Sequence, residues 1–246
     1  MKVLRLHPWQ LSVEEAQALQ RRLARQVSRD SPLAQPPRYV AGTDLSPPDG
    51  NGRVRGAAVV LSFPELRVAE VRTAEGKPGF PYIPGLLSFR EAPLVLAALE
   101  RLSVTPDLLL ADGHGLAHPR RFGLACHLGL LAEVPAAGCA KSILCGRHGP
   151  LAPERGAWVP LEDRGEVVGA AVRTRDATSP LYVSVGHKID LRDAVRWVLA
   201  CCAGYRVPEP TRLAHLAAAG KLLERGPGPS DGPVPIQQGR LLSEDG

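Results

Sequence analysis

Near the start of the chain, apolar residues recur every three to four positions, which is the spacing of one face of an α-helix. A helix is therefore predicted over residues 12–27, where Ser12 and Glu15 have the spacing of a capping box. Its polar face carries three arginines, and such a face is more often solvated than used for binding. Four further helices are predicted over residues 90–103, 120–133, 191–203 (capped by Asp190) and 210–224.

Shorter apolar runs between these helices predict β-strands. Three of them, at 38–44, 54–63 and 67–74, are joined in part by a turn-rich segment, which favours an antiparallel meander. A buried strand at 107–112 lies between two helices, so we expect it to pair in parallel inside a covered sheet. Further strands are predicted at 141–144, 157–160, 166–174 and 181–185. The whole pattern is that of an α/β protein.

The chain of 246 residues is 44% hydrophobic, which is enough for a sizeable core. No internal repeat or domain boundary interrupts residues 1–225, so a single domain is expected. Residues 226–246 are rich in Gly, Pro, Ser and Asp and predict a disordered tail. The formal charge of +5 suits a polyanionic partner but does not require one.

Five cysteines form no recognisable disulfide framework, and an odd number of them favours a reducing cytosol. No apolar run approaches the ~20 residues of a membrane span, and the N-terminus lacks the apolar stretch of a signal peptide. A cytoplasmic protein without a membrane partner is therefore expected. The Cys and His spacings do not match a four-ligand zinc site, and Gly42-Thr43-Asp44 lacks the ending of a phosphate-binding Walker loop.

Three acidic residues carry most of the candidate chemistry. Asp44 and Asp112 each close a strand, and Glu91 lies at the start of a predicted helix. Two like charges about 4 Å apart repel by roughly 4 kcal/mol at an effective dielectric of about 20, and a hard cation such as Mg²⁺ removes that cost. Each acid also has a structural interpretation: Glu91 has capping-box spacing from Ser88, and the two aspartates are common turn or cap residues.

Residues Pro81, Tyr82, Ile83 and Pro84 form an unusual loop in a chain with only 4% aromatic residues. Two prolines stiffen the loop and present an aromatic and an aliphatic side chain between them. The loop either plugs the core with these two side chains or places an apolar wedge between stacked bases.

Several basic residues accompany the acids. The segment 113–121 follows a predicted parallel strand, where ligands gather, and its Arg120 and Arg121 are expected to begin a helix, where they meet phosphate or solvent. Lys141, inside a predicted apolar strand, needs a partner such as a phosphate or a carboxylate. His215 shares a helix face with Arg212, and on its own it is more often a surface or satisfied histidine.

Read together, these segments resemble the endonuclease V family, the deoxyinosine-directed nucleases with a ribonuclease H-like fold. The resemblance covers about residues 10–225 and rests on separated blocks in the expected order. The blocks are Gly42-Thr43-Asp44, Pro81-Tyr82-Ile83-Pro84-Gly85, Phe89-Arg90-Glu91, Asp112-Gly113-His114-Gly115, Ala117-His118-Pro119-Arg120, Ala140-Lys141-Ser142, Val185-Gly186-His187-Lys188, Tyr205-Arg206 and Pro208-Glu209-Pro210-Thr211-Arg212.

The resemblance implies a central mixed sheet flanked by helices and a Mg²⁺ site, where Mn²⁺ is expected to substitute. It implies metal ligation by Asp44 and Asp112, with Glu91 as the third acid and with Lys141 and His215 beside the catalytic centre. It also implies a strand-separating wedge at Pro81, Tyr82, Ile83 and Pro84, and a base pocket lined by Gly85, Leu87, Gly113 and His118.

The implied reaction is hydrolysis of the second phosphodiester bond 3′ to deoxyinosine, which leaves a 3′-hydroxyl and a 5′-phosphate. The implied partner is damaged DNA, acted on by a monomer, and the alternative is inosine-containing RNA cleaved at the same site. His114 departs from the glutamine that we expect in many relatives, and this bears on lesion range. Two other readings are a lesion-binding protein with a decayed site and a cysteine- or zinc-dependent enzyme.

Overall fold

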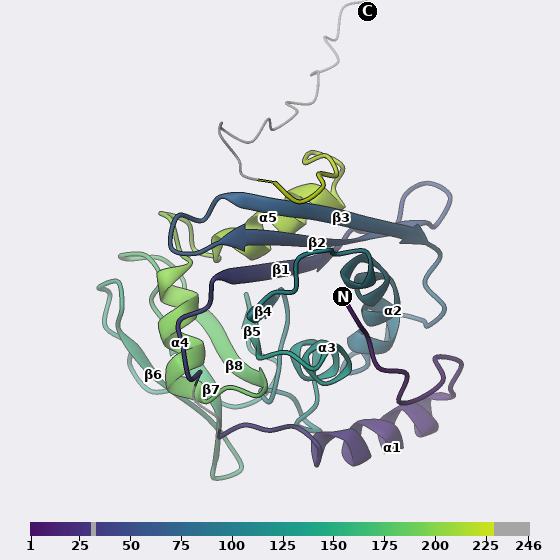
Figure 1. Cartoon of the computed structure of the whole chain (residues 1–246). Helices are drawn as coiled ribbons and strands as arrows, with labels where there is room; N and C mark the ends of the chain where they lie inside the picture. Colours follow the sequence, from purple (N-terminus) through teal and green to yellow (C-terminus); the bar gives the residue numbers. More distant parts are fainter. Residues whose placement is uncertain (31–32, 229–246) are drawn as a thin grey trace, which may run out of the picture.

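A computed structural model describes residues 1–30 and 33–228; residues 229–246, most of the predicted tail, lie outside this description. Its centre is an eight-stranded sheet with the order β3-β2-β1-β4-β5-β8-β7-β6 (Figure 1). The strands are β1 (Tyr39–Leu45), β2 (Val54–Ser62), β3 (Val68–Gly76), β4 (Leu108–Ala111), β5 (Ala136–Ala140), β6 (Trp158–Asp163), β7 (Glu166–Val172) and β8 (Leu181–His187).

The sheet is mixed, as the sequence predicts. Strands β1, β2 and β3 form the expected antiparallel meander. Strand β4 pairs in parallel with both β1 and β5, whereas β8, β7 and β6 complete the other half with antiparallel pairs. The two central parallel pairs bring the carboxyl ends of β1, β4 and β5 to one edge of the sheet.

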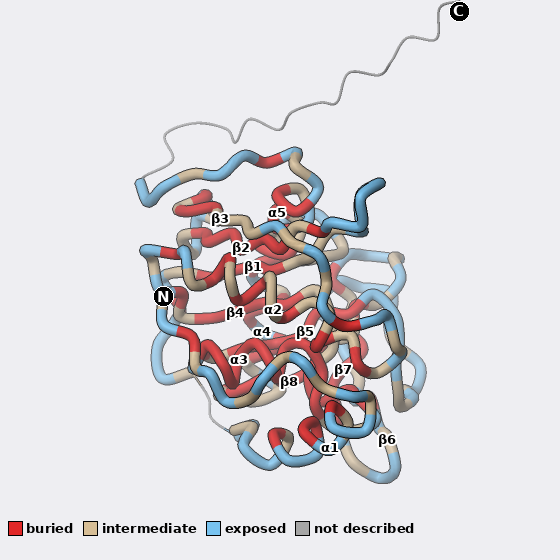
Figure 2. The backbone as a smooth tube through the Cα atoms, turned by 90° about the vertical axis from the view of Figure 1, so that its right-hand side faces the viewer, coloured by how far each residue is buried: buried red, intermediate tan, exposed pale blue. Residues whose placement is uncertain are grey.

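Helices cover both faces of the sheet (Figure 1). Alternate residues of β2 show this directly, because Ala58 and Val60 pack with α2 and α3 whereas Ala57 and Val59 pack with α5. Figure 2 shows the result, with buried backbone through the central strands and exposed backbone in the peripheral loops. The helices are α1 (Val13–Ala24), α2 (Leu87–Glu100), α3 (Leu124–Ala132), α4 (Leu191–Ala200) and α5 (Glu209–Ala218). None of the helices in the described ranges is long and apolar enough to cross a membrane.

Local capping explains where two of the helices begin. The predicted capping box of α1 is present, because the Glu15 N–H donates to Ser12 Oγ and the Ser12 N–H donates to Glu15 Oε2 at 2.7 Å. Asp190 caps α4 through the Asp193 N–H, also as predicted. In contrast, Ser88 does not cap α2, which begins one residue earlier with Leu86 as its N-cap, so the capping interpretation of Glu91 is wrong.

Three of the predicted boundaries that are wrong bear on the site. The fifth strand is Ala136–Ala140 rather than 141–144, because a run of small residues fits the crowded centre of the sheet while Ile143 and Leu144 lie partly exposed. Helix α3 begins at Leu124, so Arg120 and Arg121 lie in the preceding loop. Helix α5 ends at Ala218, and the chain beyond it turns back so that residue 225 pairs with β3.

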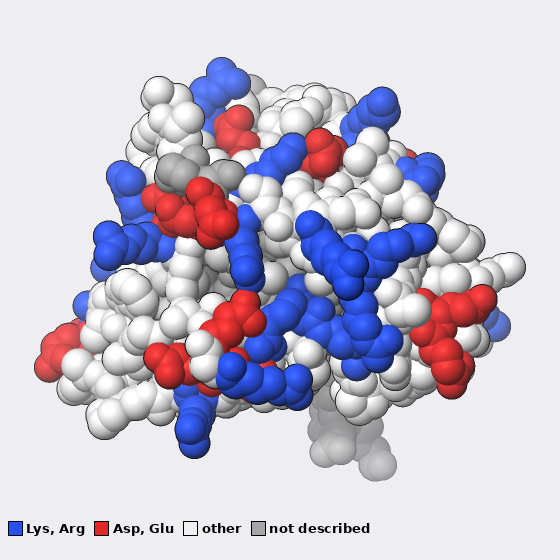
Figure 3. All heavy atoms as spheres, turned by 90° about the horizontal axis from the view of Figure 1, so that it is seen from below, with Lys and Arg blue, Asp and Glu red and all other residues white. Residues whose placement is uncertain are grey.

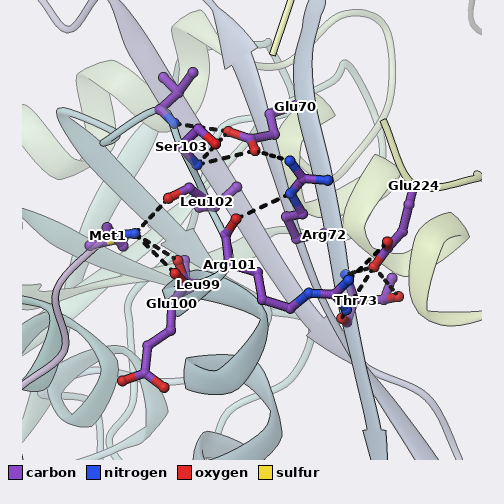
Figure 4. Close-up of polar contacts among 11 residues, drawn as sticks. Met1, Glu70, Arg72, Thr73, Leu99, Glu100, Arg101, Leu102, Ser103 and Glu224 are labelled. Carbon is purple, nitrogen blue, oxygen red and sulfur yellow. Dashed lines mark hydrogen bonds and ion pairs between the residues drawn. The ribbon is translucent and has the colours of Figure 1, made fainter. Parts of the chain in front are cut away.

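The C-terminal end of α2 is held by a polar network (Figure 4). The α-amino group of Met1 donates to the carbonyls of Leu102 at 2.6 Å and Glu100 at 3.2 Å, where a cation is favoured by the helix dipole. Close by, the fully buried Glu70 accepts from the N–H groups of Ser103 and Val104 and pairs with Arg72. This network fixes the helix that carries Glu91.

Candidate active site

Strand register brings Asp44 and Asp112 together. In the parallel pair of β1 and β4, Thr43 lies opposite Ala111. The residue that follows each of them is an aspartate, and both aspartates therefore lie at the same edge of the sheet. The Asp112 N–H donates to the Thr43 carbonyl at 3.3 Å and extends the ladder by one step. The backbone alone therefore makes these two carboxylates neighbours, as the sequence predicts.

Helix α5 adds His215 to this edge. It crosses β1 so closely that a Cβ on Gly42 would lie 2.0 Å from the carbonyl of Pro210, so only glycine is tolerated there. Asp44 is two residues beyond Gly42 and faces the same helix. Its Oδ2 atom lies 2.8 Å from Nδ1 of His215, a side chain that is 60% exposed. Arg212 turns elsewhere, because it pairs with Glu209 and stacks on Tyr205.

Lys141 reaches the same edge from β5. It follows the last residue of that strand and is half exposed, so the prediction of a lysine inside a buried strand is wrong. The predicted need for a partner is met, because its Nζ atom donates to Oδ2 of Asp112. A separate contact holds the lysine backbone, since the Arg206 guanidinium donates to the Lys141 carbonyl at 2.7 Å.

Glu91 completes the group from the first turns of α2. Burial, followed by the charges of Asp44 and Asp112, raises the pKa of Glu91 to about 8. Burial and the charge of Asp112 also raise the pKa of Asp44, although its hydrogen bond with His215 opposes the shift. These three acids therefore lie within electrostatic range of one another.

This donor set fits a hard divalent cation. Carboxylate oxygens are the ligands that Mg²⁺ prefers, and a cation between the acids would offset the burial and mutual repulsion that raise the pKa values of Asp44 and Glu91. Across the described ranges, no group of three or more His, Cys, Asp or Glu side chains already has the spacing of a metal site. Lys141 and His215 instead each hold one aspartate, so ion binding requires small movements of the carboxylates.

The loop 81–85, named here the wedge loop, separates its two apolar side chains. Tyr82 is 71% exposed, whereas Ile83 packs against the main core cluster. The core-plug interpretation is therefore right for Ile83 and wrong for Tyr82. The Leu86 N–H donates to the Ile83 carbonyl at 2.9 Å, and Gly85 has φ +77°, which with Pro84 gives the signature of a type II turn.

A cavity of about 240 Å³ lies beneath this loop. It is lined by the predicted wedge residues Tyr82, Ile83 and Pro84 and by the predicted pocket residues Gly85, Leu87 and His118. Pro81 and Gly113 do not line it. His114, which the sequence places at the border of the base pocket, also lines the cavity. The sequence did not single out five further lining residues, namely Gln20, Ser88, Gly123, Ser142 and Leu144.

Two histidines in this wall are held uncharged. Burial lowers the pKa of His118 to about 4 and also lowers the pKa of His114. The backbone N–H of Arg120 donates to Nδ1 of His118. The ring proton of His118 is therefore on Nε2, which donates to the Gly85 carbonyl at 2.9 Å. His114 Nε2 donates to the Ser142 carbonyl, one residue from Lys141, so the cavity and the carboxylate group share a wall.

Positive charge surrounds this region. Seen from the side that α1 occupies, Lys and Arg side chains gather near the middle of the face (Figure 3). Arg21, Arg22 and Arg25 are exposed on α1, and Arg21 lies close enough to Arg120 to lower the pKa of that guanidinium further, after burial. Arg121 is different, because Asp163 and Glu166 pair with it and the prediction that it meets phosphate or solvent does not hold.

A mixed sheet with acids at the ends of parallel strands, beside a cavity and a basic face, defines a nuclease with a ribonuclease H-like α/β fold. The sequence model of the endonuclease V family matches residues 21–216. Endonuclease V of Trichormus variabilis is 49% identical over 221 residues, which cover 90% of this chain and 100% of that protein. The chain therefore belongs to the endonuclease V family, and it is an endonuclease.

Solved structures agree with this assignment. The crystal structure of endonuclease V from Streptomyces avermitilis superposes with a TM-score of 0.83 at 42% identity, covering 89% of this chain and 97% of that one. Endonuclease V of Ciona intestinalis, in complex with a 24mer DNA containing an inosine followed by a ribo-adenosine, gives a TM-score of 0.73 at 28% identity and covers 85% and 96%.

Proposed function

We propose that this endonuclease recognises deoxyinosine in DNA and, with Mg²⁺, hydrolyses the second phosphodiester bond 3′ to the lesion. The products are a 3′-hydroxyl and a 5′-phosphate. The observation that carries the proposal is the shared wall between the two parts of the site: Ser142 lines the cavity and the adjacent Lys141 pairs with Asp112. The Ciona relative bound to inosine-containing DNA supports the choice of substrate.

Recognition requires the lesion to leave the base stack. The exposed Tyr82 fills the gap, and the extruded base enters the cavity beneath the wedge loop. A mispaired hypoxanthine costs less to unstack than a normal base, which favours damage at the outset.

The cavity must then exclude normal purines. Hypoxanthine lacks the 2-amino group of guanine and offers an oxygen acceptor where adenine has an amino donor. Helix α2 begins at the cavity with Leu87 and Ser88, and its N-cap Leu86 gives no side-chain hydrogen bond to the first turn. The first N–H groups of α2 are therefore suitable donors for the hypoxanthine oxygen, and rejection of guanine requires the wall of the cavity to exclude its 2-amino group.

Cleavage takes place at the adjacent carboxylates. Asp44 and Asp112, with Glu91 as the third acid, would hold Mg²⁺, which supplies the positive charge that polarises the scissile phosphate. The Lys141 ammonium, already at Asp112, is placed to stabilise negative charge that develops on the phosphate. A water molecule attacks the scissile phosphorus and the P–O3′ bond breaks, so the oxygen of the water ends on the 5′-phosphate. His215, at Asp44 and largely exposed, is placed to give a proton to the leaving 3′ oxygen.

Nicking of a duplex with one deoxyinosine tests the proposal. The duplex is incubated with and without Mg²⁺, and the product ends are mapped to the nucleotide. We expect one nick at the second bond 3′ to the lesion, only in the presence of the ion, and a matched duplex with guanine at the same position is the control. Equal cleavage of both duplexes, or cleavage unaffected by chelation, contradicts the proposal.

An inosine-specific endoribonuclease that uses the same site is the second candidate. The DNA bound by the Ciona relative carries a ribo-adenosine after its inosine, and this observation favours a test with ribonucleotides. Matched strands that contain inosine in all-DNA, all-RNA or DNA with one ribonucleotide after the inosine separate the two candidates. Faster cleavage of the all-RNA strand by tenfold or more assigns the protein to RNA.

A further inference from the structure

Gln20 is a buried polar residue on the first helix whose contacts lie far away in the sequence. It is only 1% exposed, while its neighbours Ala16, Leu19 and Leu23 on the same helix face are apolar core residues. An apolar side chain of similar length would fill this position at lower desolvation cost, unless the amide is fully hydrogen-bonded. The contacts of the amide therefore explain why a glutamine is suitable there.

Both ends of the Gln20 amide are used. Its Nε2 atom donates to the carbonyls of Gly85 and Phe122, each at 3.0 Å, and its Oε1 atom accepts from Nε of Arg120. The opposite orientation of the amide would place its oxygen against two carbonyl oxygens. The side chain thus joins α1 to the wedge loop and to the loop that precedes α3.

The Gly85 carbonyl is the common point of these contacts. Besides Gln20, it accepts from Nε2 of the neutral His118 at 2.9 Å and from Nη2 of Arg120 at 2.7 Å. Gln20, Gly85, His118 and Arg120 are named here the Gly85 network. A carbonyl oxygen with three donors is held more firmly than a loop carbonyl that faces water.

This network acts on the conformation of the wedge loop. Gly85 has φ +77°, and its peptide with Leu86 carries both this carbonyl and the N–H that donates to Ile83, so rotation of that peptide would break the turn that follows Tyr82. The other end of the loop is fixed separately, because Phe80 is buried and its carbonyl accepts from Arg90 at 3.2 Å. Between these two fixed ends, Tyr82 is exposed and depends on the backbone for its placement.

We propose that Gln20 is a positioning residue for lesion recognition: through the Gly85 carbonyl and Arg120, it holds the wedge loop in the conformation that lets Tyr82 enter the base stack. Helix α1 is then part of the recognition apparatus, although it lies apart from the carboxylates. The proposal rests on the proposed function, because it presupposes a wedge and an extruded base.

Three substitutions of Gln20 separate positioning from packing. Gln20→Met removes all three hydrogen bonds and keeps the length of the side chain. Gln20→Glu keeps the acceptor for Arg120 but turns a second oxygen toward the carbonyls of Gly85 and Phe122. Gln20→Asn keeps the amide on a chain one carbon shorter, which cannot span the same contacts. Gln17→Met, the same change at a half-buried position on the same helix, is the matched control.

Each variant is tested for binding and cleavage of duplexes with and without deoxyinosine, with 2-aminopurine fluorescence beside the lesion as a reporter of unstacking. We expect Q20M and Q20E to lose about tenfold of the preference for the lesion duplex, which corresponds to about 1.4 kcal/mol. The fluorescence rise at saturating protein should fall by at least half. The single-turnover nicking rate at saturation should change less than threefold, because the carboxylates are untouched.

The outcomes distinguish a failure of the proposed function from a failure of the positioning role of Gln20. If the wild-type protein shows no preference for deoxyinosine, the proposed function fails. If it does, and Q20M and Q20E keep both lesion preference and fluorescence within twofold of Q17M, the positioning role of Gln20 is wrong. If thermal unfolding shows that Q20M or Q20E does not fold, Q20N is judged by the same two readouts. A loss of nicking rate with unchanged lesion preference also contradicts the proposal.

Discussion

The carboxylate edge and the wedge loop are two parts of one site, but they are held in place by different means. At the carboxylate edge, β-ladder register puts Asp44 beside Asp112, and the charges repel one another. At the wedge loop, side-chain hydrogen bonds on one carbonyl fix the conformation, and His118 stays uncharged. The carboxylate edge therefore has its geometry fixed by the β-ladder and has unfavourable electrostatics, whereas the wedge loop depends on side-chain hydrogen bonds for its conformation.

This difference predicts opposite effects of substitution. Removing a charge at the carboxylate edge should cost activity without costing stability, because the fold does not depend on the charge. Removing a contact at the wedge loop should cost recognition while the chemistry persists. A variant at the carboxylate edge that loses stability along with activity, or a variant at the wedge loop that loses the chemical step along with recognition, would contradict this difference between the two regions.

The largest expected effect is the loss of cleavage when either aspartate is substituted. Asp44→Asn or Asp112→Asn should reduce nicking by at least roughly 10³-fold, because each removes one negative ligand from the expected cation site. Binding of the lesion duplex should persist, and the thermal unfolding temperature of D44N should not fall, since the change relieves repulsion with Asp112 and Glu91. Full cleavage by either variant would exclude that residue from the metal site.

The sequence predicted the carboxylate edge better than the wedge loop, for a physical reason. Asp44 and Asp112 follow apolar runs, and parallel pairing of these runs places both acids at one edge. The sequence identifies Lys141 but predicts a strand at 141–144 that includes it, because Ile143 and Leu144 look more like a core strand than the small residues 136–140. Small side chains are what the centre of this sheet accommodates, and local propensity does not reveal that.

The Gly85 network could not be predicted in the same way. Gln20 lies beside the apolar stripe of α1, where a glutamine is normally solvated, and its partners are 65 and 100 residues away. The exposed state of Tyr82 was likewise undecided, since the same loop sequence suits a wedge or a core plug. Contacts of this kind depend on how loops meet, which no periodicity encodes.

A pH-dependent stability measurement sharpens the electrostatic half of the comparison. The pKa of Glu91 is about 8 in the folded protein against 4.5 ordinarily, so between these values the folded state holds a proton that the unfolded chain releases. The free energy of unfolding should therefore fall as pH rises from about 4.5 to 8, by an amount on the order of 5 kcal/mol from this group.

Denaturant unfolding of wild type and Glu91→Gln in chelator, at several pH values, checks this expectation. In the E91Q variant, the free energy of unfolding should not show the fall with rising pH that Glu91 causes, and the variant should be more stable than wild type at pH 8. Added Mg²⁺ should reduce the difference in stability between wild type and E91Q, because the ion stabilises the ionised acids of the wild-type protein. Identical slopes in the two proteins would show that Glu91 is not held in a repulsive site.

A smaller effect is expected at the wedge. Tyr82→Ala should weaken binding of the lesion duplex by about 1–3 kcal/mol, because an aromatic side chain no longer stacks on the exposed bases. Tyr82→Phe keeps the ring and should remain close to wild type. Because Tyr82 is 71% exposed, the stability of Y82A should hardly change. An unchanged affinity in Y82A would show that the loop does not contact the bases.

The smallest expected effect concerns the basic face of α1. Arg21 is exposed and lies near Arg120, so a phosphate is a suitable partner for it. Arg21→Gln should reduce the slope of log affinity against log salt by about 0.9, the value for one lost phosphate contact with duplex DNA. The loss should be equal for lesion and undamaged duplexes, since a phosphate contact carries no base information. Arg5→Gln, at an exposed arginine paired with Glu100, is the matched control and should leave the slope unchanged. A selective loss of lesion binding in R21Q would instead place Arg21 with the wedge loop, and the boundary between non-specific attraction and recognition would then run through α1 itself.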